Sequence, residues 1–393
     1  MRTLAVPTWR LSLRASKDAS NAFRHFPQVL IGFLDRSQFQ PPPNPNSEQT
    51  MPIQSIVENK DHGLRQVVKP LLKNSVIANL GRFFLPAIAI MTLAMSGVPA
   101  VAADSKVKIG VSMALFDDVW LTLVRNAITK WGEQHPDVDL TIVDANNDSA
   151  KQTGQVENFL AQGMDAIVIL PVDTAATGPM TKSVVKAGKP LVYVNRLPSN
   201  LPKSVIYCGS NSIEAGIMNM EELGKAMGGK GNLVILMGEL SNEAAIGRTD
   251  GIKKVVKEKF PDIKIVREQT GNWKREQGKT IMENWLASGQ EIDGVASDND
   301  EMALGALQAI KAAGKLGKIP VGGTDASHDA LESMEKGELY DTVFQDPVAQ
   351  GQEAVNAAYL LVKKQPNPKV TDGNKIWIPY QRVTKENYKS FLK

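Results

Sequence analysis

The sequence predicts an α/β fold built from two doubly wound parallel-sheet lobes. From Lys106 onward, short apolar runs such as 166–170 alternate with amphipathic segments such as 119–131 in this 393-residue chain. Strands that are apolar throughout are typical of a parallel sheet covered by helices on both faces. The alternation restarts with a helix predicted over 213–227. This second series of strands and helices indicates a second lobe.

Each element is predicted from its apolar period. In the first lobe we expect strands over 107–113, 139–143, 166–170 and 190–194, and helices over 119–131, 156–160 and 180–185. In the second we expect helices over 213–227, 244–260, 277–286 and 331–336, and strands over 232–236, 263–266, 293–296, 319–321 and 340–344. A helix over 348–362 and a strand over 375–379 complete the series. A further helix begins after 293–296, and Asp298 or Asp300 is expected to cap it.

Composition excludes several classes of protein. Hydrophobic residues make up 42% and charged residues 22% of the chain, as in soluble globular proteins. The formal net charge is +3, and no basic stripe with interleaved aromatic residues is present, so nucleic acid is not favoured as a partner. Cys208 is the single cysteine, which rules out an intramolecular disulfide, and we expect it to be a small core residue.

The first hundred residues differ from the rest. Residues 1–70 show no sustained period and predict a disordered or mis-assigned extension, with Met51 a candidate for the true start. Residues 71–103 combine basic residues, a short apolar run and small residues, which predicts a secretory signal peptide and a periplasmic location. An uncleaved membrane anchor is the alternative, but the apolar run is shorter than the roughly 20 residues that a span needs.

The mature part divides into two lobes that each use two segments. We expect 104–209 and 346–371 to form the N-terminal lobe, and 210–345 and 372–393 to form the C-terminal lobe. Three hinge crossings are then expected near 208–212, 345–347 and 369–375. The cleft between the lobes is where we expect a ligand, because open parallel sheets bind ligands at the carboxyl ends of their strands.

Polar or aromatic side chains follow most of the predicted strands. The candidates for ligand binding are Asp118, Trp120, Asn195, Arg196, Arg248, Trp273, Asn299, Asp325 and Gln345. Carboxylates, amides and guanidinium groups hydrogen-bond neighbouring hydroxyls in fixed geometry. Tryptophan offers a flat apolar face for the C–H side of a ring. Their recurrence at one sheet edge predicts a cleft that holds a polyhydroxylated ring.

Other motifs do not support catalysis, cofactor binding or metal binding. The segment 271–280 has six residues between its glycines, whereas a phosphate loop needs four. His135 and His328 stand alone, without the spacing of metal ligands. Asp117 lies beside Asp118, but neighbours in sequence need not point together as a pair for glycoside hydrolysis. We therefore expect no cofactor, no metal and no enzymatic activity.

The motifs resemble those of a known family. The stretch 299–306 is similar, almost letter for letter, to one in the periplasmic sugar-binding proteins of the ribose- and galactose-binding type, the type I periplasmic binding proteins. The segments 195–196, 248–252 and 321–325 resemble three further motifs of that family, and Gln345 matches the glutamine that closes its site. The resemblance runs from about Lys106 to the C-terminus.

This resemblance implies a monomeric receptor that delivers a sugar to an ABC permease by hinge closure. It implies that Arg196 and Arg248 donate to ring hydroxyls and that Trp120 and Trp273 stack on the ring. Leu170 and Ala114 stand where ribose binders have Asn and Ser, which argues against ribose. The segment 113–118 is similar to inositol- and rhizopine-type members, so we expect a cyclitol or amino-cyclitol, with Asp118 available to pair an amine.

Other functions remain open at this stage. One alternative to import is a periplasmic sugar receptor for chemotaxis or sensing, read by a chemoreceptor. A sugar-responsive repressor would need a helix-turn-helix before Lys106, where an export signal is predicted instead. A polyol-acting enzyme would need a base with a perturbed pKa and a substrate that turns over.

Overall fold

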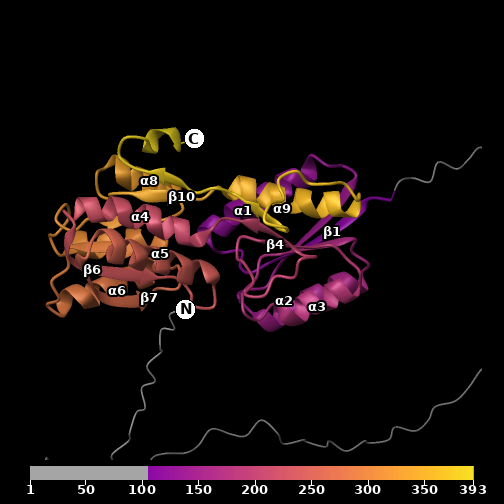
Figure 1. The fold of residues 1–393 in the computed structure, drawn as a ribbon, viewed down its shortest axis with the longest axis horizontal. Coiled ribbons are helices and arrows are strands. Elements are labelled where there is room, and N and C mark those ends of the chain that lie inside the picture. Colours follow the sequence, from indigo (N-terminus) through magenta and orange to yellow (C-terminus); the bar gives the residue numbers. More distant parts are fainter. Residues whose placement is uncertain (1–104, 393) are drawn as a thin grey trace, which may run out of the picture. The chain divides into compact units, whose positions relative to one another are not determined.

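The computed structural model describes residues 105–392 (Figure 1). The predicted extension over 1–70 and the predicted signal peptide over 71–103 lie outside these residues. Among residues 105–392, none of the helices has the length and apolar character required to cross a bilayer.

The first lobe is a parallel sheet with helices on both faces. Its elements are β1 (Val107–Met113), α1 (Val119–Glu133), β2 (Val138–Asp144), α2 (Ser149–Ala161), β3 (Ala166–Ile169), α3 (Gly178–Lys186), β4 (Leu191–Val194), β5 (Ile206–Gly209), α9 (Pro347–Val362) and β11 (Lys375–Trp377). The strand order is β11-β5-β4-β3-β1-β2, and every neighbouring pair runs parallel. In such a doubly wound order the strand sequence reverses between β1 and β3, which places a crevice at their carboxyl ends.

The second lobe repeats this plan. Its elements are α4 (Ser212–Ala226), β6 (Lys230–Met237), α5 (Glu243–Lys259), β7 (Asp262–Thr270), α6 (Arg275–Ala287), β8 (Gly294–Ser297), α7 (Asp300–Ala312), β9 (Val321–Gly322), α8 (His328–Glu335), β10 (Thr342–Phe344), β12 (Gln381–Val383) and η1 (Tyr388–Ser390). The strands β7-β6-β8-β9 run parallel, and β10 pairs antiparallel with β12. The reversal here lies between β6 and β8, so this lobe also presents a crevice at its strand ends.

The third crossing between the lobes is displaced from its predicted place. β11 pairs with β5 in parallel, from Lys375 opposite Tyr207 to Trp377 opposite Gly209, so it belongs to the first sheet. The predictions of a crossing near 369–375 and of residues 372–377 in the C-terminal lobe are therefore wrong. The chain crosses over Ile378–Tyr380, between β11 and β12. β5 (Ile206–Gly209) was missed by the sequence analysis, which placed the first crossing near 208–212, over the second half of this short strand.

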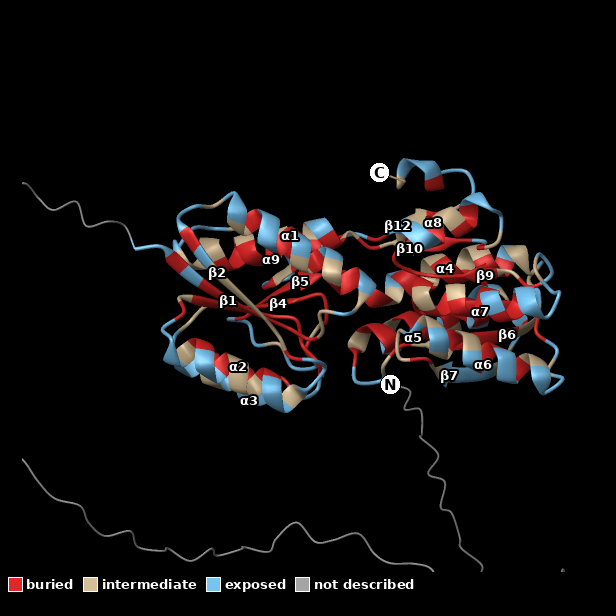
Figure 2. Ribbon diagram, turned by 180° about the vertical axis from the view of Figure 1, so that it is seen from behind, coloured by how far each residue is buried: buried red, intermediate tan, exposed pale blue. Residues whose placement is uncertain are grey.

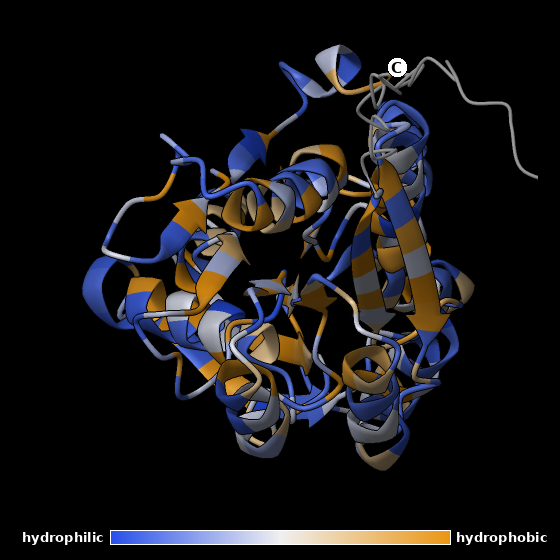
Figure 3. Cartoon of the chain, turned by 90° about the vertical axis from the view of Figure 1, so that its right-hand side faces the viewer, coloured by the Kyte–Doolittle hydropathy of each residue, from blue (hydrophilic) through white to orange (hydrophobic). Residues whose placement is uncertain are grey.

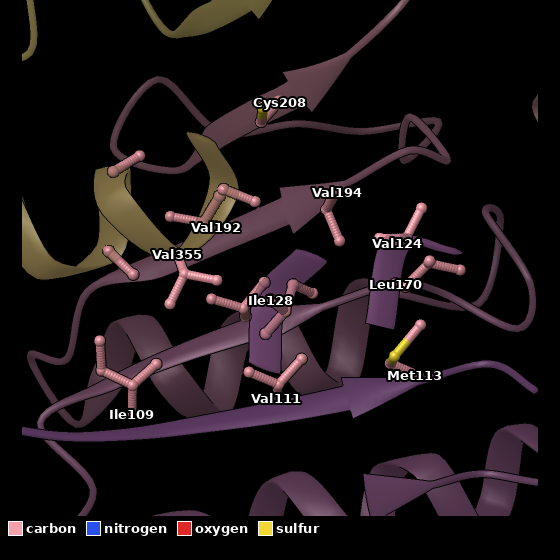
Figure 4. Close-up of a cluster of buried hydrophobic side chains, with 14 of the residues drawn as sticks. Ile109, Val111, Met113, Val124, Ile128, Leu170, Val192, Val194, Cys208 and Val355 are labelled. Carbon is pink, nitrogen blue, oxygen red and sulfur yellow. The ribbon is translucent and has the colours of Figure 1, made fainter. Parts of the chain in front are cut away.

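Each sheet is sealed by apolar cores on both faces. In the first lobe, side chains of α1 and α9 pack on one face of the sheet, and those of α2 and α3 pack on the other. Figure 4 shows Ile128 of α1 and Val355 of α9 near Val111 of β1 and Val192 of β4. Buried residues fill the central strands of the sheets, whereas the edge strand β7 and the outer faces of the helices are largely exposed (Figure 2). The helices accordingly show alternating hydrophobic and hydrophilic stripes (Figure 3), as the predicted amphipathic periods require.

Local sequence explains how these elements are placed. Asp118, Asp148 and Asp346 cap α1, α2 and α9 by accepting hydrogen bonds from backbone N–H groups of the first turn. Gly110 lies under the ring of Phe159, where an added Cβ would come within 2.6–2.9 Å of ring carbons. The strand can therefore approach α2 closely only because residue 110 has no side chain. These caps fix where the helices begin, directly after the strand ends that carry the candidate site.

Candidate functional site

The structure brings all nine predicted residues around one cavity of about 380 Å³. Asp118, Trp120, Asn195, Arg196, Arg248, Trp273, Asn299, Asp325 and Gln345 line it, together with Leu121, Asn242 and Ala244. The first four come from the first lobe, and the next four from the second; Gln345 lies on the second crossing.

Asp118 and Trp120 form the wall at the end of β1. Asp118 accepts a hydrogen bond from the backbone N–H of Leu121 through Oδ1 at 2.8 Å, so this carboxylate both caps α1 and borders the cavity. Its Oδ2 has no hydrogen-bond partner within residues 105–392. Trp120 donates from Nε1 to the carbonyl of Gln345 at 3.2 Å and is buried. The indole is therefore fixed to the second crossing, with its ring at the cavity.

Asn195 and Arg196 follow β4 on a short turn. Asn195 has φ of 65°, a left-handed conformation that asparagine tolerates better than most residues. Arg196 donates from Nη1 to the carbonyls of Pro171 and Val172, at 3.0 and 3.2 Å. Its Nε is buried without an acceptor in the described chain. Burial lowers the pKa of Arg196, while Glu239 and Asp118 act in the opposite direction from a distance.

Arg248, on α5, makes more polar contacts than Arg196 does. It donates to the carbonyl of Asp298 at 2.5 Å, to Oε1 of Gln345 at 2.7 Å and to the hydroxyl of Tyr380 at 3.3 Å. It also lies 3.6 Å from a carboxylate oxygen of Asp325. Burial lowers the pKa of Arg248, but Tyr380 and Asp325 raise it by more, so that the net shift is upward. Only its Nε lacks an acceptor within the described residues.

Trp273 is presented by an unusual turn after β7. Asn272 and Trp273 have φ of 50° and 65°, both in the left-handed region. The indole ring packs against Gly238, where an added Cβ would clash with ring carbons. Its Nε1 is a buried donor with no acceptor in the described chain. The ring therefore depends on a glycine from the end of the neighbouring strand β6 for its place at the cavity.

Asn299 combines two tasks that the sequence analysis had assigned to different residues. Its Oδ1 accepts from the backbone N–H of Met302 at 3.0 Å, so Asn299 itself caps α7. The prediction that Asp298 or Asp300 caps this helix is wrong. The Nδ2 of Asn299 donates to the carbonyl of Trp273 at 3.1 Å, which ties the cap to the tryptophan turn.

The two aspartates on either side of Asn299 are buried behind the cavity wall. Asp298 accepts from the N–H of Gly238 at 3.0 Å and from the Thr249 hydroxyl at 3.2 Å. Asp300 accepts from Thr342 and from the N–H of Ser327, both at 2.7 Å. Burial raises the pKa of Asp298 to about 7 and that of Asp300 to about 6.

Asp325 supplies the carboxylate on the second-lobe side. Its backbone has φ of 127° and its side chain is 9% exposed. Burial raises the pKa of Asp325 well above its ordinary value, and the guanidinium of Arg248 opposes that rise. Since Arg248 already shares its donors among four groups, a ligand donor is a natural further partner for this carboxyl group.

The lobes touch each other around the cavity. The N–H of Thr174 donates to the carbonyl of Ser241 at 3.0 Å, and Nδ2 of Asn147 donates to Oε1 of Glu239 at 3.0 Å. Both bonds join a loop of the first lobe to the loop that follows β6. Together with the bond from Trp120 to Gln345, they hold the lobes in a closed arrangement.

The arrangement can hold a neutral or weakly charged polyol. It offers two guanidinium groups, two carboxyl groups, four amides and two indoles around one small cavity. Within the described residues, no cluster of three or more His, Cys, Asp or Glu side chains could hold a metal ion. Cys208 is buried and burial raises the pKa of its thiol, which fits the expected core role.

Two contributing residues were missed by the sequence analysis. Asn242 caps α5 by accepting from the N–H of Ala244 at 3.0 Å and also lines the cavity. Its position between the end of β6 and Arg248 was the available signal. Tyr380 reaches Arg248 from the third crossing, and it could not be found because that crossing had been placed too early.

Comparison with known proteins finds relatives over most of the chain. The model of a family described as "Periplasmic binding protein domain" matches residues 109–366. A protein of Rhizobium meliloti that carries the name of a rhizopine-binding protein is 47% identical over 288 residues, which cover 72% of this chain and 92% of that protein. The ribose import binding protein of Bacillus subtilis is 31% identical over 72% of this chain and 91% of its own length.

Solved structures are similar to a comparable share of the chain. An ABC transporter solute-binding protein from Bacillus halodurans, with bound myo-inositol, matches with a TM-score of 0.70 and 39% identity. It covers 74% of this chain and 99% of that one. The myo-inositol-binding protein of Caulobacter, also bound to myo-inositol, matches with a TM-score of 0.67 and 25% identity, over 72% and 95% of the two chains.

Proposed function

Because the chain belongs to the periplasmic binding protein family, we propose that it binds a cyclitol of the inositol type between its lobes and delivers it to an ABC permease. The ligand is held by Asp118, Trp120, Asn195, Arg196, Arg248, Trp273, Asn299, Asp325 and Gln345. The protein acts as a monomer and performs no chemistry on the ligand. It reaches the periplasm through the signal peptide predicted over 71–103.

One observation carries this proposal. Three residues at the cavity, Arg196, Arg248 and Trp273, each keep a buried N–H donor without an acceptor in the described chain. A buried donor without a partner costs about 1–3 kcal/mol, so such donors are expected where a ligand supplies oxygen atoms. The carboxyl groups of Asp118 and Asp325 on opposite walls can accept the hydrogens of the same hydroxyls. A ring with a hydroxyl on every carbon meets both needs.

Closure follows from the division of the site between the lobes. A ligand that contacts both walls favours the closed arrangement by its difference in affinity for the closed and open forms. The bonds of Thr174 to Ser241 and of Asn147 to Glu239 then form across the rim. A permease can recognise the surface that exists only when the two lobes meet.

Calorimetric titration with a panel of polyols tests the proposal. Purified protein that begins at Asp104 is titrated with myo-inositol, scyllo-inositol, xylitol and D-ribose. We expect at least one inositol to bind at least about tenfold more tightly than D-ribose, a difference of about 1.4 kcal/mol. Binding of D-ribose without binding of either inositol contradicts the proposal.

A second readout separates binding from catalysis. The protein is incubated with the tightest ligand of the panel, and the mixture is followed by proton NMR. We expect the ligand to remain unchanged over many hours. Appearance of a product would instead support a polyol-acting enzyme.

A further inference from the structure

A chain of buried hydrogen bonds links the third crossing to one amide of the site. The hydroxyl of Ser210 donates to the carbonyl of Ile378 at 2.7 Å. Nε2 of Gln350 donates to that hydroxyl at 2.9 Å, and Nδ2 of Asn195 donates to Oε1 of Gln350 at 3.1 Å. Gln350 is wholly buried on α9, and Ser210 and Asn195 are 4% and 9% exposed. This series of hydrogen bonds therefore has no access to water except at the cavity.

The bond to the Ile378 carbonyl determines which atom donates in each of these hydrogen bonds. A backbone carbonyl can only accept a hydrogen bond, so the Ser210 hydroxyl must donate to Ile378. The lone pairs of that hydroxyl then accept from the amide nitrogen of Gln350, which leaves the amide oxygen of Gln350 to accept from Asn195. Asn195 consequently keeps its Oδ1 for the cavity that it lines. Within residues 105–392 this oxygen has no other partner.

The backbone of Asn195 and Ser210 is held by bonds that do not involve the side chain of Gln350. Tyr207 donates from its hydroxyl to the carbonyls of Asn195 and Ser210, at 2.7 and 3.2 Å. The N–H of Asn195 donates to the carbonyl of Cys208 at 2.9 Å. Loss of Gln350 would thus release the amide of Asn195 to turn, while the main chain stays in place.

Asn299, another amide on the cavity wall, provides a contrast. Asn299 uses Oδ1 to accept from Met302 and Nδ2 to donate to Trp273, so its orientation is fixed by its own helix and a neighbouring turn. The orientation of Asn195 depends instead on two side chains, Gln350 and Ser210, that do not line the cavity.

We propose that Gln350 and Ser210 are positioning residues that hold the amide oxygen of Asn195 toward the ligand, so that the site selects a hydroxyl group that donates there. The inference deepens the proposed function and rests on it. It assigns specificity to a pair of residues on the hinge side that do not line the cavity. An analogue in which fluorine replaces that hydroxyl cannot donate and should be rejected.

The test compares wild type with Gln350→Met, a side chain of similar length that neither donates nor accepts strongly. Both proteins are titrated calorimetrically with myo-inositol and with each of its monodeoxyfluoro analogues. In wild type, fluorine at one ring position should weaken binding by about tenfold or more, because Oδ1 of Asn195 is left unpaired. In Gln350→Met the same substitution should cost only about threefold or less, since the amide can turn and offer its nitrogen.

Glu353→Met is the matched control on the same helix. Glu353 is 7% exposed and bonds to Lys369, Asn356 and Asn367, with no contact to the cavity. This variant should keep the full fluorine penalty of wild type. If Gln350→Met weakens every ligand equally and leaves the penalty unchanged, its role is merely structural and the proposal is overturned.

Ser210→Ala keeps the proposal testable if Gln350→Met fails to fold. It removes the acceptor that orients Gln350, and the fluorine penalty should again fall. If the fluorine penalty persists in the variants that fold, the positioning role is wrong, while the proposed function still stands. If wild type binds neither myo-inositol nor any analogue, the proposed function fails and this inference fails with it.

Discussion

The two arginines of the cavity sit on opposite lobes and have opposite surroundings. Arg248 donates to the Asp298 carbonyl, Gln345 and Tyr380 and lies beside Asp325, and its pKa is raised overall. Arg196 donates only to two backbone carbonyls, and burial lowers its pKa. Both are about equally buried, at 4% and 5% exposure.

The difference indicates a division of labour. Arg248 compensates a buried carboxyl group and joins the second lobe to the second and third crossings, so it belongs to the fold as much as to the site. Arg196 has no carboxylate within ion-pair distance among the described residues. The N–H groups on its Nε and Nη2 accordingly are the stronger candidates for bonding a ligand oxygen. The two sides of the cleft should therefore respond differently to substitution.

The largest expected effect is that of Arg248→Ala. It leaves Asp325 buried without its counter-charge and removes partners from Gln345 and Tyr380. Breaking a buried pair in this way typically costs about 3–5 kcal/mol of unfolding free energy. Urea denaturation without ligand measures this loss, and inositol binding should also disappear. An unfolding free energy equal to that of wild type would contradict a role for Arg248 in the fold.

Arg196→Ala should act mainly on binding. Loss of charge-assisted hydrogen bonds to the ligand is expected to weaken inositol binding by about 10- to 100-fold. The unfolding free energy should fall by less than in Arg248→Ala, because only the carbonyls of Pro171 and Val172 lose a partner. Calorimetry and urea denaturation on the same samples give both numbers. The reverse ranking of stabilities would refute the division of labour.

Gly238→Ala should have an intermediate effect through Trp273. The added Cβ cannot be accommodated while the indole stays against Gly238, so the ring must shift within the cavity. We expect inositol affinity to fall by about 3- to 10-fold, which corresponds to about 0.7–1.4 kcal/mol.

Gly154→Ala is the matched control for this substitution. Gly154 lies within α2 and has nothing within 4 Å of an added Cβ, so alanine should leave affinity unchanged and stabilise the helix by about 0.5–1 kcal/mol. Unchanged affinity in Gly238→Ala would show that Trp273 does not depend on this glycine.

A further expected effect is a pH dependence of the unfolding free energy on the second-lobe side. The folded chain retains the proton of Asp298 to about pH 7, whereas the unfolded chain releases it near the ordinary pKa of 3.8. The folded state therefore binds more protons between these values, and stability falls as pH rises through the window, by at most about 1.4 kcal/mol per pH unit for one group.

Asp298→Asn should flatten this pH dependence. The amide keeps the shape of the side chain next to Gly238 and Thr249 but cannot titrate. Urea denaturation of wild type and variant from pH 4.5 to 7.5 measures the two slopes. A slope that is identical in both proteins would show that Asp298 contributes nothing to it; the remaining slope in the variant reports on groups such as Asp300.

The sequence predicts the residues that line the cavity better than it predicts the contacts that hold those residues in place. All nine candidate residues follow strand ends, and the carboxyl ends of parallel strands meet at one edge, so position in the chain implied position in space. The cap of α7 was misassigned because Asp298, Asn299 and Asp300 have equal local claims, and only contacts with Gly238, Thr342 and Trp273 separate them.

The third crossing and the chain from Gln350 to Asn195 were beyond sequence reasoning for a related reason. β11 is only Lys375–Trp377, and its choice of sheet depends on pairing with β5, which lies about 170 residues earlier. The bond from Gln350 to Asn195 spans 155 residues, and nothing in the local sequence marks it.

A crystal structure of the protein with myo-inositol tests the central claim most directly. We predict a ring between the two lobes, bounded by Trp120 and Trp273, with Nε of Arg196 within about 3.2 Å of a ring hydroxyl. A ring bound elsewhere, or bound in the cavity with Arg196 making no contact, would contradict the account.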